Sequence, residues 1–314
     1  MSSQVHISNL DLNDLLSSDD QNIPNFNPTS VNTIGGFESK YYTPDQFNNE
    51  VLPVNGSNTC MSILHINCRS LKKNFDTITD YLYLLKVKFD FILLSETWLS
   101  GSPDQLLSLD GYDYYGESRQ SRGGGVGIYA RNVFKIIKRP DLCIFNENIE
   151  SHFLEVTQSN GKNVIIAVVY RPPSQSITNF VTELGNVLEK IDNENKICYF
   201  LGDFNLNLFE IHSDQHVNSF IELFFSYSFV PLITKATRIT PSSATLIDNV
   251  FVNDINRVFR SGILMSDISD HLPIFLICKS NQRINSNVQQ TYYKRDMSHS
   301  NIDKFRNTLA AHCW

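Results

Sequence analysis

The sequence has no apolar run long enough to cross a lipid bilayer. A membrane-spanning helix needs ~20 consecutive apolar residues, whereas the longest apolar run here, Val164–Tyr170, has the length of a strand. The N-terminus also lacks the basic and apolar regions of a secretory signal. We therefore expect an intracellular protein with no transmembrane segment and no membrane partner.

Closely spaced cysteine pairs are also absent. The six cysteines are Cys60, Cys68, Cys143, Cys198, Cys278 and Cys313. None forms a CxxC pair, and four of them lie within or beside apolar runs. This distribution predicts core thiols in a reducing compartment and argues against a disulfide framework or a zinc site.

An excess of positive charge, which proteins that bind nucleic acid often carry, is missing as well. The chain has 26 Lys and Arg against 33 Asp and Glu, a net charge of −7. Residues 1–58 hold seven of those acids and one base, so the remaining residues are nearly neutral. Because residues 1–58 are rich in Asn, Ser and Asp, we predict a disordered acidic leader there. A domain over residues 59–280 and a basic tail over residues 281–314 follow.

Apolar runs of strand length alternate with amphipathic segments through the predicted domain. Strands are predicted over residues 62–67, 90–95, 125–130, 153–156, 164–170, 198–201, 246–252 and 272–278, and helices over residues 75–86, 177–191 and 217–227. Many strands with a few helices between them indicate a layered α/β protein built on large sheets.

The most informative of these strands ends at Gly202-Asp203-Phe204-Asn205. Asp203 and Asn205 flank an apolar ring, so both polar side chains can face one cleft while Phe204 packs away from it. Gly, Asp and Asn are also common turn residues, and a plain turn is the alternative for this stretch taken alone.

Four further strand ends and one strand interior carry similar polar groups. They contribute Asn67, Glu96, Tyr170, Asp248, Asp270 and His271. Each has an ordinary structural explanation by itself, such as a turn residue or a buried histidine. Together, oxygen ligands without a thiol suit Mg²⁺ or Mn²⁺, and an acid near a histidine suits proton transfer.

This set of motifs resembles the endonuclease/exonuclease/phosphatase superfamily, whose best-known type is the apurinic/apyrimidinic endonucleases. It is most similar to the endonuclease domain of LINE-type (non-LTR) retrotransposon polyproteins. The matching motifs, in the family order, are His65–Leu71, Ser95–Leu99, Gly123–Tyr129, Tyr170–Pro173, Gly202–Asn205, Ala244–Asp248 and Ser269–His271. The resemblance implies a DNase I-like four-layer α/β sandwich, in which two packed, mostly antiparallel β-sheets are flanked by helices.

The resemblance also implies a role for each matching residue. Glu96 is expected to be the principal metal ligand, with Asn67 beside it and Asp270 contributing. Asp203 is expected to orient or deprotonate the attacking water, and Asn205 to hold the scissile phosphate with Tyr170 nearby. His271 would contact the phosphate, with Asp248 holding its imidazole, and either Asp203 or His271 could take the proton.

Basic residues cluster around the glycine run at 123–125, namely Arg119, Arg122, Arg131, Lys135, Lys138 and Arg139. They suit a loop that follows a phosphate backbone, and a solvated surface stretch is the alternative. Arg119 and Arg122 are the predicted DNA contacts from this cluster. Arg171 and Arg238 are two more, Arg238 because the family has a DNA-contacting hairpin in that region.

The function that the resemblance implies is a Mg²⁺-dependent DNA endonuclease, with Mn²⁺ as a substitute ion and no small-molecule cofactor. In the family the nick leaves a 3′-hydroxyl that primes reverse transcription, so a reverse transcriptase is expected in cis in full-length relatives, and residues 281–314 resemble the start of the linker to it. A DNA substrate implies a nuclear site of action. The alternatives are a phosphoesterase acting on RNA, lipid or inositol phosphate, and a non-catalytic nucleic-acid-binding remnant.

Overall fold

The computed structural model describes residues 39–51, 60–100, 107–119, 123–159, 161–280 and 299–310. The chain divides into two compact units, Met1–Arg283 and Ile284–Trp314. The described part of the second unit is helix α7 (His299–Ala310). The first unit contains two large β-sheets and every described residue of the predicted site.

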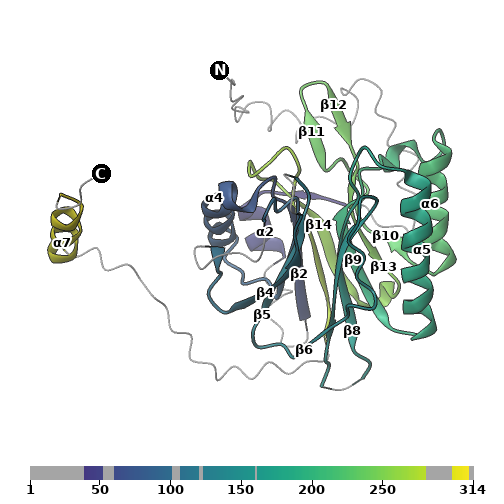
Figure 1. The fold of residues 1–314 in the computed structure, drawn as a ribbon, viewed down its shortest axis with the longest axis horizontal. Helices are drawn as coiled ribbons and strands as arrows, with labels where there is room; N and C mark the ends of the chain where they lie inside the picture. Colours follow the sequence, from purple (N-terminus) through teal and green to yellow (C-terminus); the bar gives the residue numbers. More distant parts are fainter. Residues whose placement is uncertain are drawn as a thin grey trace. The chain divides into compact units, whose positions relative to one another are not determined.

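The first sheet has seven strands in the order β1-β14-β15-β2-β3-β5-β4 (Figure 1). They are β1 (Tyr41–Tyr42), β14 (Val258–Leu264), β15 (Ile274–Lys279), β2 (Cys60–Asn67), β3 (Phe91–Ser95), β5 (Val126–Arg131) and β4 (Tyr112–Glu117). The pairs β1–β14 and β2–β3 are parallel, and the other four pairs are antiparallel.

The second sheet has six strands in the order β10-β13-β9-β8-β7-β6. They are β10 (Val230–Pro231), β13 (Asp248–Val252), β9 (Ile197–Asp203), β8 (Val164–Tyr170), β7 (Glu150–Val156) and β6 (Ile136–Lys138). Only the pair β8–β9 is parallel. A separate hairpin joins β11 (Arg238–Thr240) to β12 (Ser243–Thr245).

The two sheets pack face to face and helices cover their outer faces (Figure 1). Helices α4 (Leu71–Leu84) and α2 (Pro44–Glu50) bury apolar residues against the seven-stranded sheet. Helices α5 (Ile177–Asn193) and α6 (Gln215–Ser226) lie on the six-stranded sheet. Short 3₁₀ turns occur at Leu208–Glu210 and Ile255–Arg257. The predicted four-layer sandwich is confirmed.

Strand alternation aims the polar residues into the space between the sheets. The ring of Phe200 in β9 packs against Phe224 of α6, on the outer side, and the ring of Phe204, directly after β9, packs against Phe220 and Phe224. Successive side chains of a strand point to opposite faces, so Asp203 points inward. No residue other than glycine fits at position 202, because a Cβ there would lie 1.9 Å from the carbonyl oxygen of Val169.

The domain begins earlier than residue 59, the boundary that the sequence analysis predicts. Strand β1 pairs with β14, and the Phe47 ring of α2 is fully buried between Phe89 and Phe275. Thr43 caps α2 by accepting from the main-chain N–H of Gln46, whose side chain accepts from Thr43 in return. Residues 39–51 therefore belong to the folded domain and not to a disordered leader.

The described cysteines are all free, and four of these five are buried, as expected of core thiols. Among the described residues, no helix has both the length and the apolar character that crossing a membrane requires.

Candidate functional site

Strand register brings the predicted polar residues to one edge of the sandwich. Parallel pairing sets Asn67 of β2 beside Ser95 of β3, and Tyr170 of β8 beside Asp203 of β9. Antiparallel pairing sets Asp248, the first residue of β13, opposite Asp203. Parallel strands end at the same edge of a sheet, so these residues converge from both sheets.

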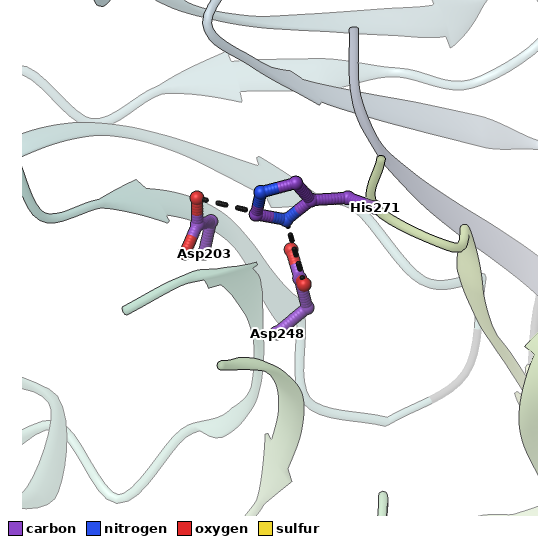
Figure 2. Close-up of side chains that lie close together, drawn as sticks. All are labelled: Asp203, Asp248 and His271. Carbon is purple, nitrogen blue, oxygen red and sulfur yellow. Dashed lines mark hydrogen bonds and ion pairs between the residues drawn. The ribbon is translucent and has the colours of Figure 1, made fainter. Parts of the chain in front are cut away.

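Asp203, Asp248 and His271 form a compact buried group (Figure 2). His271 Nδ1 donates a hydrogen bond of 2.9 Å to Asp248 Oδ2 and lies 3.9 Å from Asp203 Oδ2. Thr237 Oγ1 donates to the same Asp248 oxygen at 2.8 Å. Both aspartates are at most 1% exposed. Asp248 therefore fixes the tautomer and orientation of the imidazole.

Burial and mutual charge shift the pKa values of this group. Burial, followed by the negative charge of Asp248, raises the pKa of Asp203 to about 7. Burial alone would lower the pKa of His271, but its ion pair and hydrogen bond with Asp248 and the charge of Asp203 raise it to about 9. At neutral pH the imidazole is protonated, and Asp203 is poised to gain or lose a proton.

We predict that the His271 ion pair makes the protein less stable as the pH rises from 7 to 9. The pKa of His271 is higher in the folded state than the ordinary value near 6.5, so its contribution is fully present below pH 6.5 and is lost as the pH approaches 9. The loss over this window is on the order of 2 kcal/mol. Denaturant unfolding of the wild type and of His271→Gln at pH 7 and pH 9 measures it, because titrating groups other than the coupled Asp203 cancel in the difference. An equal pH dependence in both proteins would contradict the prediction.

Asn67 joins Glu96 to Asp203. Its side-chain Nδ2 donates to Glu96 Oε1 at 3.0 Å and to Asp203 Oδ2 at 2.9 Å. The second oxygen of Glu96 accepts from the indole Nε1 of Trp98 at 3.2 Å. Glu96 and Trp98 have positive φ angles of 54° and 52°, which are costly for residues other than glycine and are common at functional sites. The Glu96 carboxylate is thus held in one orientation by two donors.

The donor set around Glu96 fits a hard divalent cation. The carboxylates of Glu96 and Asp203 offer oxygen atoms, and no thiol is among these residues. The amide of Asn67 turns its Nδ2 to both carboxylates and its Oδ1 to the N–H of Arg69, so Asn67 would bind a metal ion only after its amide rotates. The negative charge of Glu96 is also one of the causes that raise the pKa of Asp203, which shows that acids are crowded here. The Asp203–Asp248–His271 group suits a metal less well, because His271 Nδ1 is already bonded to Asp248.

Tyr170 and Asn205 lie beside Asp203. Tyr170 is 5% exposed, and burial, together with the charges of Glu96 and Asp203, raises the pKa of its hydroxyl. The hydroxyl therefore stays protonated and can donate. The main-chain N–H of Asn205 donates to Asp203 Oδ1 at 3.0 Å. Its side-chain amide donates to the carbonyl of Arg171 at 2.8 Å and, more weakly, to Asp203 Oδ2 at 3.3 Å.

Arg171 has a different role from the predicted DNA contact. The side chain is 3% exposed, and its guanidinium donates to the carbonyl oxygens of Phe204 and Asn205 at 2.8 Å each. It also donates to the carbonyls of Pro172 and Gln175 at 3.2 and 3.1 Å. Because these bonds occupy the guanidinium inside the protein, Arg171 ties the Asp203–Asn205 loop in place and does not reach a surface ligand.

Arg119 is anchored by an acid that the sequence analysis missed. Glu150, at the start of β7, is fully buried and accepts from Arg119 Nε and from the main-chain N–H of Gly125. Gly124 has a φ of 65°, and a Cβ there would lie 2.6 Å from Arg119 Nε and 2.6 Å from Glu150 Oε1. The glycine run is therefore fixed locally by Glu150. Arg122 lies outside the described residues.

The remaining bases of that cluster are partly engaged inside the protein. Arg131 pairs with Asp90 at 2.9 Å. Arg139 is 8% exposed and pairs with Asp141, Glu155 and Glu194. These two arginines stabilise the sheets, and they are not candidates for contact with a phosphate backbone.

Asp270, which was predicted to contribute to the metal site, is bonded to two arginines. Arg69 Nη1 donates to its Oδ1 at 2.7 Å, and Arg238 Nε donates to its Oδ2 at 2.9 Å. Burial alone would raise the pKa of Asp270, but these two hydrogen bonds hold it below its ordinary value. Both carboxylate oxygens thus already have cationic partners.

His65 is a further site neighbour that sequence reasoning missed. Its ring is 1% exposed, its Nε2 lies 3.1 Å from Ser95 Oγ and its Nδ1 lies 4.0 Å from Asp248 Oδ1. Burial lowers its pKa to about 4, so it is neutral. Strand alternation places His65 on the same face as Asn67, and the motif His65–Leu71 begins with it, so the sequence held two signals that pointed to this residue.

The fold and the site together define a phosphoesterase-type α/β sandwich. The model of the endonuclease/exonuclease/phosphatase family matches residues 64–271, and the chain belongs to this family. The matched range contains Asn67, Glu96, Asp203, Asp248 and His271. The search of curated proteins finds no match.

Solved structures of nucleases share the fold. The endonuclease domain of TRAS1, a telomere-specific non-LTR retrotransposon, is 14% identical with a TM-score of 0.58, over 71% of this chain and 100% of that one. An AP endonuclease from Leishmania major is 14% identical with a TM-score of 0.57, over 73% and 91%. A 3′ phosphatase from Neisseria bound to a product DNA hairpin is 16% identical with a TM-score of 0.54, over 69% and 98%. At these identities the likeness establishes the fold.

Proposed function

We propose that this protein is a divalent-metal-dependent endonuclease that nicks one strand of DNA and leaves a 3′-hydroxyl able to prime reverse transcription. Membership of the endonuclease/exonuclease/phosphatase family supports hydrolysis of a phosphodiester. The observation that carries the proposal is the buried Asp203–His271–Asp248 group next to the Glu96–Asn67 pair. The retrotransposon-type motifs and the TRAS1 fold support the finer assignment of substrate and product.

Asp203 is the proposed general base. A general base works best when its pKa is near the working pH, and the pKa of Asp203 is about 7. The N–H donors of Asn67 and Asn205 fix the orientation of its carboxylate. Asp203 would accept the proton of the attacking water through an oxygen held in this way.

His271 is the proposed donor to the phosphate. Nδ1 is bonded to Asp248, so the ring nitrogen on the opposite side, Nε2, carries a proton in the imidazolium and can donate to a phosphoryl oxygen. The hydroxyl of Tyr170 and the amide of Asn205 supply further donors. The amide would give up its 3.3 Å contact with Asp203 Oδ2 and donate to a phosphoryl oxygen instead. Donors fixed before the reaction stabilise developing charge most effectively.

Mg²⁺ or Mn²⁺ would be held by Glu96 and Asn67 and, when bound, would neutralise negative charge on the phosphoryl group. The two hydrogen bonds to the Glu96 carboxylate orient it for that purpose. Since the proposed substrate is DNA, we propose a nuclear site of action.

Supercoiled plasmid incubated with the protein tests this function. In Mg²⁺ or Mn²⁺ we expect conversion to the open-circular form, and in EDTA a rate at least about 10²-fold lower, because the ion stabilises the transition state. Extension of the nicked product by a DNA polymerase detects the 3′-hydroxyl. Nicking that persists in EDTA would contradict the metal dependence, and a folded protein that makes no nick in either ion would overturn the endonuclease.

A further inference from the structure

Asp270 links two arginines that come from distant parts of the sequence. Arg69 follows β2, and Arg238 begins the β11–β12 hairpin. Each donates to a different oxygen of Asp270, at 2.7 Å and 2.9 Å. The side chains of Arg69 and Arg238 are 48% and 42% exposed, whereas that of Asp270 is 23% exposed. The carboxylate is therefore the inner member of the group, and the guanidinium groups face solvent.

The main chain places this group directly beside the catalytic residues. Arg238 forms an isolated β-bridge with His271, and the main-chain N–H of Leu272 donates to the carbonyl of Thr237 at 2.7 Å. Thr237 points inward to Asp248, so Arg238, the next residue along an extended chain, points outward. On the other side, the N–H of Arg69 donates to the side chain of Asn67 at 3.3 Å.

The charge balance of the group favours an anion. Two guanidinium groups and one carboxylate carry a net charge of +1, at the rim of a site whose interior holds Glu96, Asp203 and Asp248. A guanidinium has five N–H donors, and each of these arginines uses one of them on Asp270 in the hydrogen bonds given above. Guanidinium donors match the geometry of phosphate oxygens and can bind them in pairs.

We propose that Arg69, Asp270 and Arg238 form a phosphate clamp that binds a backbone phosphate of the DNA next to the scissile one. Asp270 acts as the bridge that orients the two arginines, and it is not a metal ligand. The clamp deepens the proposed endonuclease function and rests on it. It adds Arg69 to the DNA contacts and gives Asp270 a positioning role.

Salt dependence of DNA binding tests the two arginines. Binding of a short labelled duplex is measured in EDTA, where no cleavage is expected, over a series of salt concentrations. Each contact with a phosphate contributes a slope of about 0.9 to the plot of log affinity against log salt, so Arg69→Gln and Arg238→Gln are each expected to lower the slope by about 0.9. The matched control is Lys162→Gln, since this exposed lysine lies between β7 and β8, at the opposite end of the sheet from Tyr170.

Metal binding tests the role of Asp270. Trp98 donates to Glu96, so quenching of its fluorescence by Mn²⁺ reports occupancy next to Glu96. Trp314→Phe removes the other tryptophan of the chain. In that background we expect Glu96→Gln to weaken Mn²⁺ binding more than about tenfold, as loss of a ligand does, and Asp270→Asn to change it less than about threefold.

The outcomes separate the clamp from the function on which it rests. The clamp would be overturned if the wild type binds and nicks DNA but the salt slopes of Arg69→Gln and Arg238→Gln equal that of Lys162→Gln. Equal losses of Mn²⁺ affinity in Asp270→Asn and Glu96→Gln would make Asp270 a ligand and also overturn it. A folded wild type that neither binds nor nicks DNA would overturn the endonuclease function itself.

Discussion

Asp203→Asn is expected to reduce plasmid nicking by about 10³-fold, which is the largest catalytic loss that we predict for any single substitution. An amide has the shape of the carboxylate but cannot take the proton of the attacking water. The carboxylate is fully buried, is held by Asn67 and Asn205 and has a pKa of about 7. Its replacement removes the one group in the site whose proton affinity matches general-base work near neutral pH.

The same substitution is expected to leave the protein folded. Removing the buried charge of Asp203 relieves its repulsion with Asp248, while the new amide satisfies fewer of the donors that faced the carboxylate. These effects oppose each other, so we expect the melting temperature to change by only a few degrees. Asp113→Asn is the matched control, because Asp113 is exposed on β4.

Initial nicking rates in Mg²⁺, measured for wild type, Asp203→Asn, Asp113→Asn and His271→Gln, provide the test. If Asp203→Asn retained more than about a tenth of the wild-type rate while His271→Gln lost activity, His271 would be the general base. That result would reverse the roles proposed here for the two residues.

Secondary structure and side-chain direction were predictable from the sequence where they depend on neighbouring residues. Apolar runs gave the central strands, and the period of two placed Asp203 and Phe204 on opposite faces, as the ring contacts of Phe204 with α6 confirm. The capping box at Thr43 and Gln46 was a readable signal for helix α2 that the compositional view of residues 1–58 overlooked. Strands β4 and β14 were missed because charged and polar residues interrupt their apolar pattern.

Residues whose role depends on a partner far along the chain were not predictable in this way. Arg171, Asp270 and Glu150 each have a charge that the sequence shows and a partner that only the fold supplies. An arginine near a site motif can contact DNA only if its side chain faces solvent, and the sequence does not show which way the side chain faces. Burial decided between these for Arg171, which is 3% exposed.

Arg171→Met is expected to lower the free energy of unfolding by about 3 kcal/mol, a large effect for one side chain. The four carbonyl oxygens of Phe204, Asn205, Pro172 and Gln175 would lose a charged donor, and a buried acceptor without a partner costs about 1–3 kcal/mol. Methionine retains most of the apolar stem, so the loss reports the guanidinium. Arg171→Lys keeps the charge without the planar fork and is expected to recover only part of the stability.

Nicking should fall with stability in Arg171→Met even where the protein remains folded, because the carbonyl oxygens of Phe204 and Asn205, in the loop that follows Asp203, lose their guanidinium donor. Denaturant unfolding and nicking at a temperature well below the melting transition measure the two effects separately. A DNA-contacting arginine would behave differently: its loss would lower the salt slope by about 0.9 and leave unfolding unchanged. That pattern in Arg171→Met would restore the DNA contact, whereas a wild-type slope with lower stability would establish Arg171 as the residue that holds the catalytic loop.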